Sequence, residues 1–234
     1  GYRDKVVLAT KFGQTQVEGG GMSVDGRPEY VMEACEKSLQ RLGVDVIDLY
    51  YQHRVDQEVP IEDTVGAMAK LVEQGKVKAI GICEAKPETI RKAHATHPLA
   101  AVQSEFSLIY REEAEQIRAA TKELGITFVA YSPLGRGILT DQYVNAETVD
   151  ENDPHYRHPR FNKDNFQANR ELILRVAAYA DKKGCTPAQL VLAWLIGLGD
   201  DIVAIPGTKR AERLDENTAA VGVSLTADEI AEIS

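Results

Sequence analysis

Five polar residues close short apolar runs of the sequence, and their types suit proton transfer and hydrogen bonding to a polar group. They are Lys11 after Val-Val-Leu-Ala-Thr, His53 after Leu-Tyr-Tyr-Gln, Gln103 and Glu105 after Ala-Ala-Val, and Tyr131 after Thr-Phe-Val-Ala. Each alone has an ordinary structural explanation, such as a lysine that extends to water or a histidine with satisfied hydrogen bonds. Together, at the ends of successive runs, they indicate a shared site.

The segments that must position these residues alternate between two kinds. Short β-branched or apolar runs predict buried strands, at Lys5–Thr10, Asp45–Gln52, Val77–Ile82, Ala100–Phe106, Ile126–Tyr131 and Ile202–Ile205. Stretches of helical periodicity lie between them, many with proline near the start and glycine near the end; they are Tyr30–Leu42, Ile61–Glu73, Glu112–Leu124 and Ala188–Leu198.

This alternation predicts βαβ units around a parallel sheet, either an open doubly wound sheet or a closed barrel. No GxGxxG motif follows an early strand, which favours the barrel. In a barrel the carboxyl ends of the strands share one rim, so the five polar residues would meet there. We count about six of the eight βα units of a TIM barrel. We therefore predict an α/β fold, a (β/α)8 TIM barrel lacking roughly its first two units, as a single domain over residues 1–234.

Composition narrows the function classes. Of the 234 residues 44% are hydrophobic, which is enough for a sizeable core. The net charge of −9 argues against binding to nucleic acid or to anionic lipid. The longest apolar run, Leu190–Leu198, is too short to span a bilayer. The three cysteines form no CxxC pair, which favours a reducing compartment, and we expect the cytoplasm.

Two further features leave alternatives open. The polar segment Asn145–Ala168 is predicted to be either a mobile surface loop or a functional lid. The pairs His94/His97 and His155/His158 lack the carboxylate or cysteine pattern that completes a metal site, so no metal is expected.

Several motifs, in order, resemble the aldo-keto reductase superfamily. They are Ala-Thr-Lys-Phe-Gly around Lys11, Tyr-Tyr-Gln-His-Arg around His53, Val-Gln-Ser-Glu-Phe-Ser around Gln103, Tyr-Ser-Pro-Leu-Gly-Arg-Gly from Tyr131, and the segment Ile205–Asn217. With Pro-Arg-Phe at residues 159–161, the chain looks most similar to the branch that contains perakine reductase, auxin-induced-like reductases and potassium-channel β subunits. The resemblance covers nearly the whole chain.

The resemblance implies a catalytic tetrad of Asp, Tyr, Lys and His, of which Lys11 and His53 match two. No residue before Lys11 matches the Asp and Tyr, so the chain shows no expected proton donor. A lysine cation lowers the pKa of a nearby phenol, and an imidazole can hydrogen-bond a carbonyl oxygen.

The resemblance also implies an NADPH site. Gln103 would bind the nicotinamide carboxamide with Cys83 and Glu84, where the family usually has Ser followed by Asn or Glu, and a thiol is the weaker donor. Tyr131 would stack on the nicotinamide ring. The pyrophosphate would lie along Ser132, Pro133, Leu134 and Gly135, with Arg160 crossing over it. The adenosine phosphate would be bound by Gly207, Thr208, Lys209, Arg213, Glu216 and Asn217.

The function implied is an NADPH-dependent oxidoreductase that transfers a hydride between nicotinamide and an aldehyde or ketone, or works in reverse on an alcohol. Two alternatives remain: a cofactor-sensing regulatory subunit of the channel-β type, and an inactive pseudo-enzyme. The expected partner is a small carbonyl or alcohol substrate, and the sequence leaves that substrate and the oligomeric state open.

Overall fold

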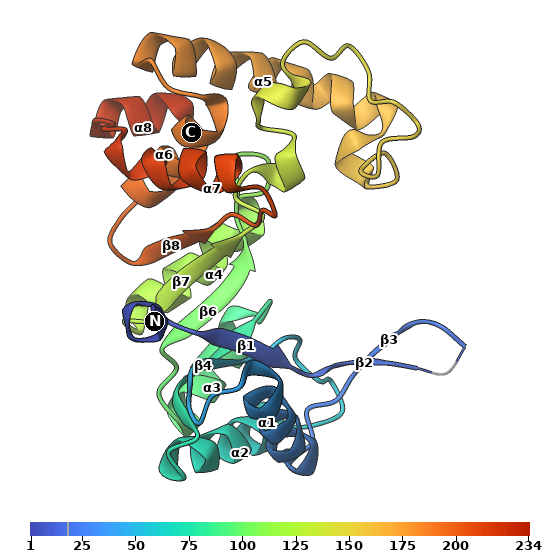
Figure 1. Cartoon of the computed structure of the whole chain (residues 1–234), viewed down its shortest axis with the longest axis vertical. Helices are drawn as coiled ribbons and strands as arrows, with labels where there is room; N and C mark the ends of the chain where they lie inside the picture. The colour runs from blue at the N-terminus through green and yellow to red at the C-terminus, as the bar shows by residue number, and fades with distance from the viewer. Residues whose placement is uncertain (18) are drawn as a thin grey trace. The chain divides into compact units, whose positions relative to one another are not determined.

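The computed structural model describes residues 1–17 and 19–234. Figure 1 shows the order of the elements along the chain. The strands are β1 (Ala9–Phe12), β2 (Gln14–Gln16), β3 (Met22–Val24), β4 (Ile47–Gln52), β5 (Val77–Cys83), β6 (Ala101–Glu105), β7 (Thr127–Tyr131) and β8 (Ile202–Ile205). The α-helices are α1 (Pro28–Leu42), α2 (Ile61–Glu73), α3 (Pro87–Thr96), α4 (Glu112–Glu123), α5 (Lys163–Lys183), α6 (Pro187–Gly197), α7 (Ala211–Ala219) and α8 (Ala227–Ile233).

One sheet contains every strand that the sequence predicted. Its order is β1-β4-β5-β6-β7-β8, and β2 pairs with β3 in a separate antiparallel ribbon. The pairs β1–β4, β4–β5 and β5–β6 are parallel, and helices connect successive strands from β4 to β7. Since parallel neighbours need such crossover connections, this arrangement confirms the predicted α/β class.

Contacts between residues divide the chain into two compact units. Unit 1 contains residues 1–104 and 115–128, and unit 2 contains residues 105–114 and 129–234. Strands β6 and β7 contribute residues to both units. That the chain behaves as a single domain stays a prediction.

In unit 1, helices α1 and α2 each bury one apolar face. Helix α1 begins at Pro28, whose missing N–H costs nothing in a first turn, and ends at Leu42, after which Gly43 adopts a φ of 65°. Helix α2 buries Met68 and Leu71 completely. Burial of side chains of this size stabilises the fold by about 1.5–3 kcal/mol each.

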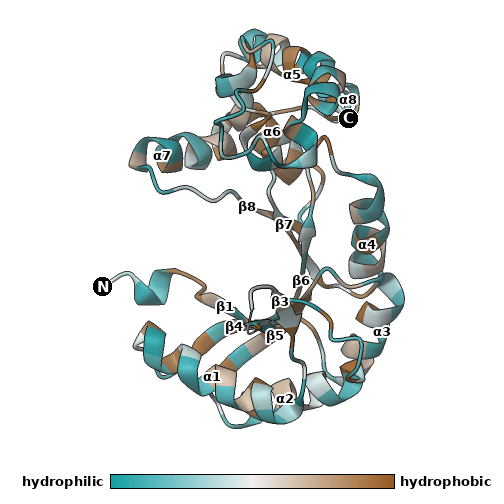
Figure 2. Ribbon diagram, turned by 90° about the vertical axis from the view of Figure 1, so that its right-hand side faces the viewer, coloured by the Kyte–Doolittle hydropathy of each residue, from teal (hydrophilic) through white to brown (hydrophobic). Residues whose placement is uncertain are grey.

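In unit 2, helix α6 is buried on nearly all sides, and Figure 2 shows brown over much of it. A capping box of Thr186 and Gln189 begins the helix by satisfying free N–H groups of its first turn. The fully buried Trp194 donates a hydrogen bond of 3.0 Å from Nε1 to Ser234 Oγ. Within the described residues, no helix has the length and apolarity needed to cross a membrane.

Most element ends lie within two residues of the predicted ones, and three features differ more. Pairing with β4 begins at Ala9, so Lys5–Thr10 was placed too early as a strand. The ribbon of β2 and β3 was not predicted. Helix α5 begins at Lys163, within the segment Asn145–Ala168 that was predicted to be a loop or a lid. The Asn162 side chain caps the first turn of this helix by accepting a hydrogen bond of 3.0 Å from Asn165 N.

Candidate functional site

In unit 1, four neighbouring strands bring Lys11 and Gln103 into contact. Lys11 on β1 stands in register with Tyr51 on β4, Tyr51 with Gly81 on β5, and Gly81 with Ala101 on β6. Because side chains alternate along a strand, Gln103 points to the same face as Ala101. The Lys11 Nζ donates a hydrogen bond to Gln103 Oε1 across these strands.

His53 follows β4 directly and is placed by its backbone N–H, which donates to Phe12 O at 2.8 Å. Burial lowers the pKa of the His53 imidazole, and the positive charges of Lys11 and Arg54 lower it further. The ring is therefore neutral near pH 7 and has one N–H to donate.

The last residue of β5, Cys83, is buried and lies close enough to Lys11 for that charge to act on its thiol. Burial raises the pKa of its thiol to about 12, and the Lys11 charge only partly opposes this effect. The thiol is thus protonated at neutral pH and is a weak hydrogen-bond donor.

The backbone of Glu84 adopts a positive φ of 52°, an uncommon conformation that a non-glycine residue holds only where its surroundings enforce it. Its N–H donates to Gln103 O at 2.9 Å, and its Oε1 accepts from Ser104 Oγ at 2.9 Å. Through these two bonds, both the backbone and the side chain of Glu84 are attached to β6.

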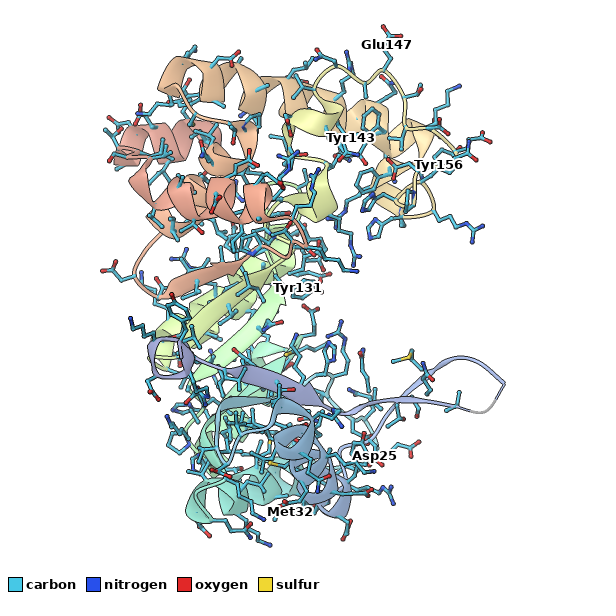
Figure 3. All side chains as sticks on the ribbon, in the orientation of Figure 1. Asp25, Met32, Tyr131, Tyr143, Glu147 and Tyr156 are labelled. Atoms are coloured by element: carbon cyan, nitrogen blue, oxygen red, sulfur yellow. The ribbon has the colours of Figure 1, made fainter. Side chains whose placement is uncertain are left out.

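Unit 2 contains a separate groove of about 440 Å³ at the ends of β7 and β8. The side chain of Tyr131 lies where β7 ends (Figure 3). The predicted residues that line the groove are Tyr131, Ser132, Pro133, Leu134, Gly207, Thr208, Arg213, Glu216 and Asn217. Two segments far apart in the sequence therefore meet in one groove.

The turn after β7 forms one wall of this groove, and its backbone is unusual. Ser132 has φ of 49°, Gly135 of 59° and Arg136 of 62°. At Gly135 an added Cβ would lie 2.8 Å from Ile109 Cδ1 and 2.9 Å from Ile138 Cγ2, so the close packing under the turn requires glycine.

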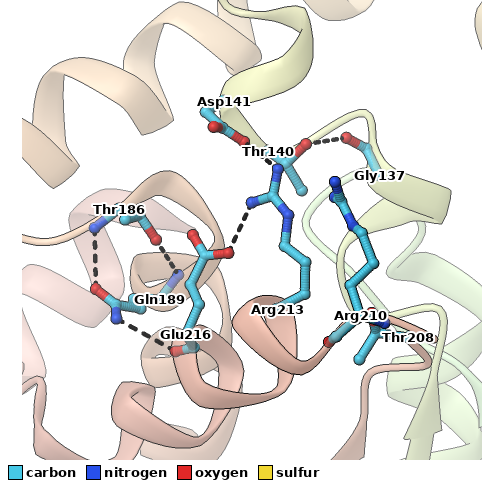
Figure 4. A network of polar contacts seen from close by, with 9 residues as sticks. All are labelled: Gly137, Thr140, Asp141, Thr186, Gln189, Thr208, Arg210, Arg213 and Glu216. Atoms are coloured by element: carbon cyan, nitrogen blue, oxygen red, sulfur yellow. Dashed lines mark hydrogen bonds and ion pairs between the residues drawn. The ribbon is translucent and has the colours of Figure 1, made fainter.

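Arg213, on the first turn of α7, is fixed by two carboxylates (Figure 4). Its Nη1 lies 2.6 Å from Glu216 Oε2 and its Nη2 3.0 Å from Asp141 Oδ1. Asp141 is 61% exposed, so its contribution is screened by solvent. The guanidinium is thereby oriented by one largely buried carboxylate, Glu216, and one exposed carboxylate, Asp141.

Sequence reasoning missed two arginines of the groove and included one lysine that does not line it. Arg136 and Arg210 both line the groove, whereas Lys209 is exposed and outside the lining. Position in a motif does not tell which of two neighbouring side chains faces inward. The role of Lys209 stays a prediction.

Arg160 also lies apart from this groove. It lines a smaller cavity of unit 2 with His158, and its Nη2 lies 2.6 Å from Glu105 Oε1. Its predicted position over a pyrophosphate stays a prediction. In the part of the chain that the structure describes, no group of three or more His, Cys, Asp or Glu side chains could hold a metal ion.

The family model for the aldo/keto reductase family matches residues 1–234. The chain belongs to this family. The "Probable aldo-keto reductase 1" of Glycine max is 49% identical over 231 residues, which are 99% of the chain. The chain spans 66% of the length of that relative, slightly less than two thirds.

Two solved structures of aldo-keto reductases share the fold. The glycerol dehydrogenase AKR11B4 from Gluconobacter oxydans is 27% identical, with a TM-score of 0.89 over 98% of this chain and 72% of its own. A thermostable aldo-keto reductase, solved with the inhibitor epalrestat, is 25% identical, with a TM-score of 0.77 over 99% of this chain and 71% of its own. These likenesses confirm the predicted TIM-barrel type of fold.

Within this aldo-keto reductase chain, Tyr51 was missed as a neighbour of the site. It is 1% exposed and lies beside Lys11 on the same sheet face as His53, two residues further along. The period-two alternation of a strand could have found it, because that pattern alone places Tyr51 and His53 on one side.

Proposed function

We propose that this chain is the cofactor-binding and carbonyl-binding part of an NADPH-dependent oxidoreductase. The reaction is hydride transfer between nicotinamide and the carbonyl carbon of a small aldehyde or ketone, or its reverse from an alcohol. Family membership supports the reaction class. The observation that carries the choice of cofactor is the arginine-lined groove of unit 2, which offers cationic side chains to a phosphorylated nucleotide.

The groove suits the phosphate-bearing half of the cofactor. Arg210 lies on its wall just before α7, and Arg213 on the first turn of that helix. A helix N-terminus adds free N–H groups and the positive end of the helix dipole. A 2′-phosphate would displace the exposed Asp141 from Arg213, while the more buried Glu216 keeps the guanidinium oriented.

The residues of unit 1 suit the reacting end. When bound, the nicotinamide supplies or accepts the hydride. Gln103 would hold the carboxamide by its side-chain amide. The family resemblance assigns Tyr131 to stacking on the ring, which leaves the other ring face to substrate. Cys83 would add a weak hydrogen bond where a hydroxyl would be stronger.

Lys11 and His53 would act on the carbonyl oxygen. The neutral imidazole of His53 donates its N–H to the oxygen, which polarises the carbonyl. The Lys11 ammonium favours the ionised form of a phenol placed beside it, and so eases proton transfer from that phenol. A general acid of this kind contributes about 10²–10⁴-fold to the rate.

Titration of the intact protein with NADPH and NADH tests the cofactor. NADPH should bind at least about tenfold more tightly, because a 2′-phosphate gains charge-assisted hydrogen bonds that a 2′-hydroxyl does not, each about 1.5–3 kcal/mol before screening. Two double variants should each lose most of this preference. One combines Arg210→Ala with Arg213→Ala, and the other combines Lys209→Ala with Arg213→Ala. Arg157→Ala, an exposed arginine of unit 2, serves as the matched control. Equal affinities in the intact protein would contradict the proposal.

A further inference from the structure

Asp141 stands beside the groove that the proposed function assigns to the phosphate-bearing half of the cofactor. It begins the short 3-10 helix Asp141–Tyr143, and both of its chain neighbours, Thr140 and Gln142, line the groove. Its carboxylate extends to helix α7, where Oδ1 accepts a hydrogen bond of 3.0 Å from Arg213 Nη2 (Figure 4). Asp141 thus places a negative charge on an arginine that a phosphate would need.

The two carboxylates on Arg213 differ in how firmly they are held. Glu216 follows Arg213 by three residues on the same helix, its side chain is 15% exposed, and it raises the pKa of the guanidinium most. Its backbone carbonyl also accepts a hydrogen bond of 3.2 Å from Gln189 Nε2. Asp141 is 61% exposed and raises that pKa less. Because ion pairs that are exposed to water contribute little, the contact with Asp141 is the one that a competing anion can break.

The charges at this point of the groove do not balance. Arg213 brings one positive charge, and Asp141 and Glu216 bring two negative charges within 3.0 Å of it. A 2′-phosphate would add about 1.5 to 2 further negative charges at neutral pH. It must either displace Asp141 or lie beside it, and both arrangements cost binding free energy because like charges repel. A ribose with a 2′-hydroxyl brings no charge and meets no such cost.

We propose that Asp141 is a specificity-determining residue of the cofactor site, which competes with a 2′-phosphate for Arg213 and so limits the preference for NADPH over NADH. The inference rests on the proposed function, in which Arg213 binds that phosphate. Glu216 keeps the guanidinium oriented when Asp141 gives way. The groove therefore binds a 2′-phosphate less tightly than its arginines alone would allow.

Asp141→Asn removes the charge and keeps both the size of the side chain and an oxygen that can accept from Arg213. Glu147→Gln is the matched control, because it removes one negative charge from an exposed residue of the same unit, and Figure 3 shows Glu147 far from the groove residue Tyr131. The two probes are adenosine 2′,5′-bisphosphate and adenosine 5′-monophosphate, which differ only in the 2′-phosphate. Dissociation constants are measured with the full-length protein and with each variant, at low and at high salt.

Asp141→Asn should tighten bisphosphate binding about three- to tenfold at low salt and leave monophosphate binding unchanged, while Glu147→Gln changes neither. The gain should shrink at high salt, because salt screens exposed charges. In an Arg213→Ala background, Asp141→Asn should lose most of its effect, since the residue for which it competes is gone.

An unchanged or weakened bisphosphate affinity in Asp141→Asn would overturn the inference. Equal tightening of both probes, or a full effect in the Arg213→Ala background, would overturn it as well, because the charge would then act on the whole groove rather than through Arg213. Failure of the proposed function looks different: the full-length protein and Asp141→Asn would then bind neither probe, and the inference would fall with it.

Discussion

At the scale of single residues, the candidate site of unit 1 depends on side chains that are far apart in the sequence and meet in the fold. Lys11 and Gln103, 92 positions apart, were named from their motifs, and the structure places them in direct contact. Tyr51 lies within the motif around His53 but was not named, because its place beside Lys11 follows from the register of neighbouring strands. Arg210 was passed over for Lys209 for a similar reason: the direction of a side chain just before a helix depends on backbone angles that local sequence does not fix.

Cys83 gives a residue-scale prediction. Cys83→Ser should tighten NADPH binding about two- to fivefold, because a hydroxyl is a stronger donor than a protonated thiol for the carboxamide. Equilibrium titration of the variant and the intact protein measures this. Cys185→Ser, at a partly exposed cysteine of unit 2, is the control and should leave the affinity unchanged. An unchanged or weaker affinity in Cys83→Ser would place the thiol away from the carboxamide.

At the scale of elements, the periodicity of apolar residues predicted the central parts of helices and strands well and their ends less well. Helix α2 and strand β8 occupy Ile61–Glu73 and Ile202–Ile205, as predicted. Strand β1 begins later than its apolar run, because a strand exists only where a neighbour pairs with it. Helix α5 was partly hidden in a polar segment, since its first turn relies on the Asn162 cap rather than on apolar residues.

The start of β1 depends on Asp48, which gives an element-scale prediction. Asp48 accepts hydrogen bonds from Arg3 at 2.5 Å and from Leu8 N at 2.8 Å, and Lys78 Nζ lies 2.7 Å away. Arg3 and then Lys78 hold the pKa of this carboxyl far below its usual value. Asp48→Asn should therefore lower the melting temperature at pH 7, as followed by circular dichroism.

The pH dependence of this effect has a definite sign. A carboxyl whose pKa is lower in the folded state stabilises the fold above its unfolded value of about 3.9, and this stabilisation is lost as the pH falls toward the folded value. The difference in melting temperature between the intact protein and Asp48→Asn should thus shrink below about pH 4. Asp45→Asn, at a nearby exposed residue, is the control. A difference that stays constant with pH would show that the charge of Asp48 does not matter.

At the scale of the whole molecule, the predicted single domain can be tested through the only tryptophan of the sequence, Trp194. It is buried in unit 2, whereas circular dichroism reports on both units. Because β6 and β7 contribute to both units, we expect fluorescence and circular dichroism to unfold with the same midpoint in urea. Asp48→Asn, in unit 1, should shift both midpoints equally. Two separate midpoints would show that the units unfold independently.

The central claim is hydride transfer from NADPH to a carbonyl, and repeated turnover tests it most directly. Purified full-length protein is mixed with excess NADPH and a panel of small aldehydes and ketones, and oxidation of NADPH is followed together with the alcohol formed. We predict many turnovers per protein, at about 1–10³ per second for a good substrate, and a large loss of rate in Lys11→Met with NADPH binding retained. Oxidation that stops near one equivalent of NADPH would contradict the account and favour a cofactor sensor.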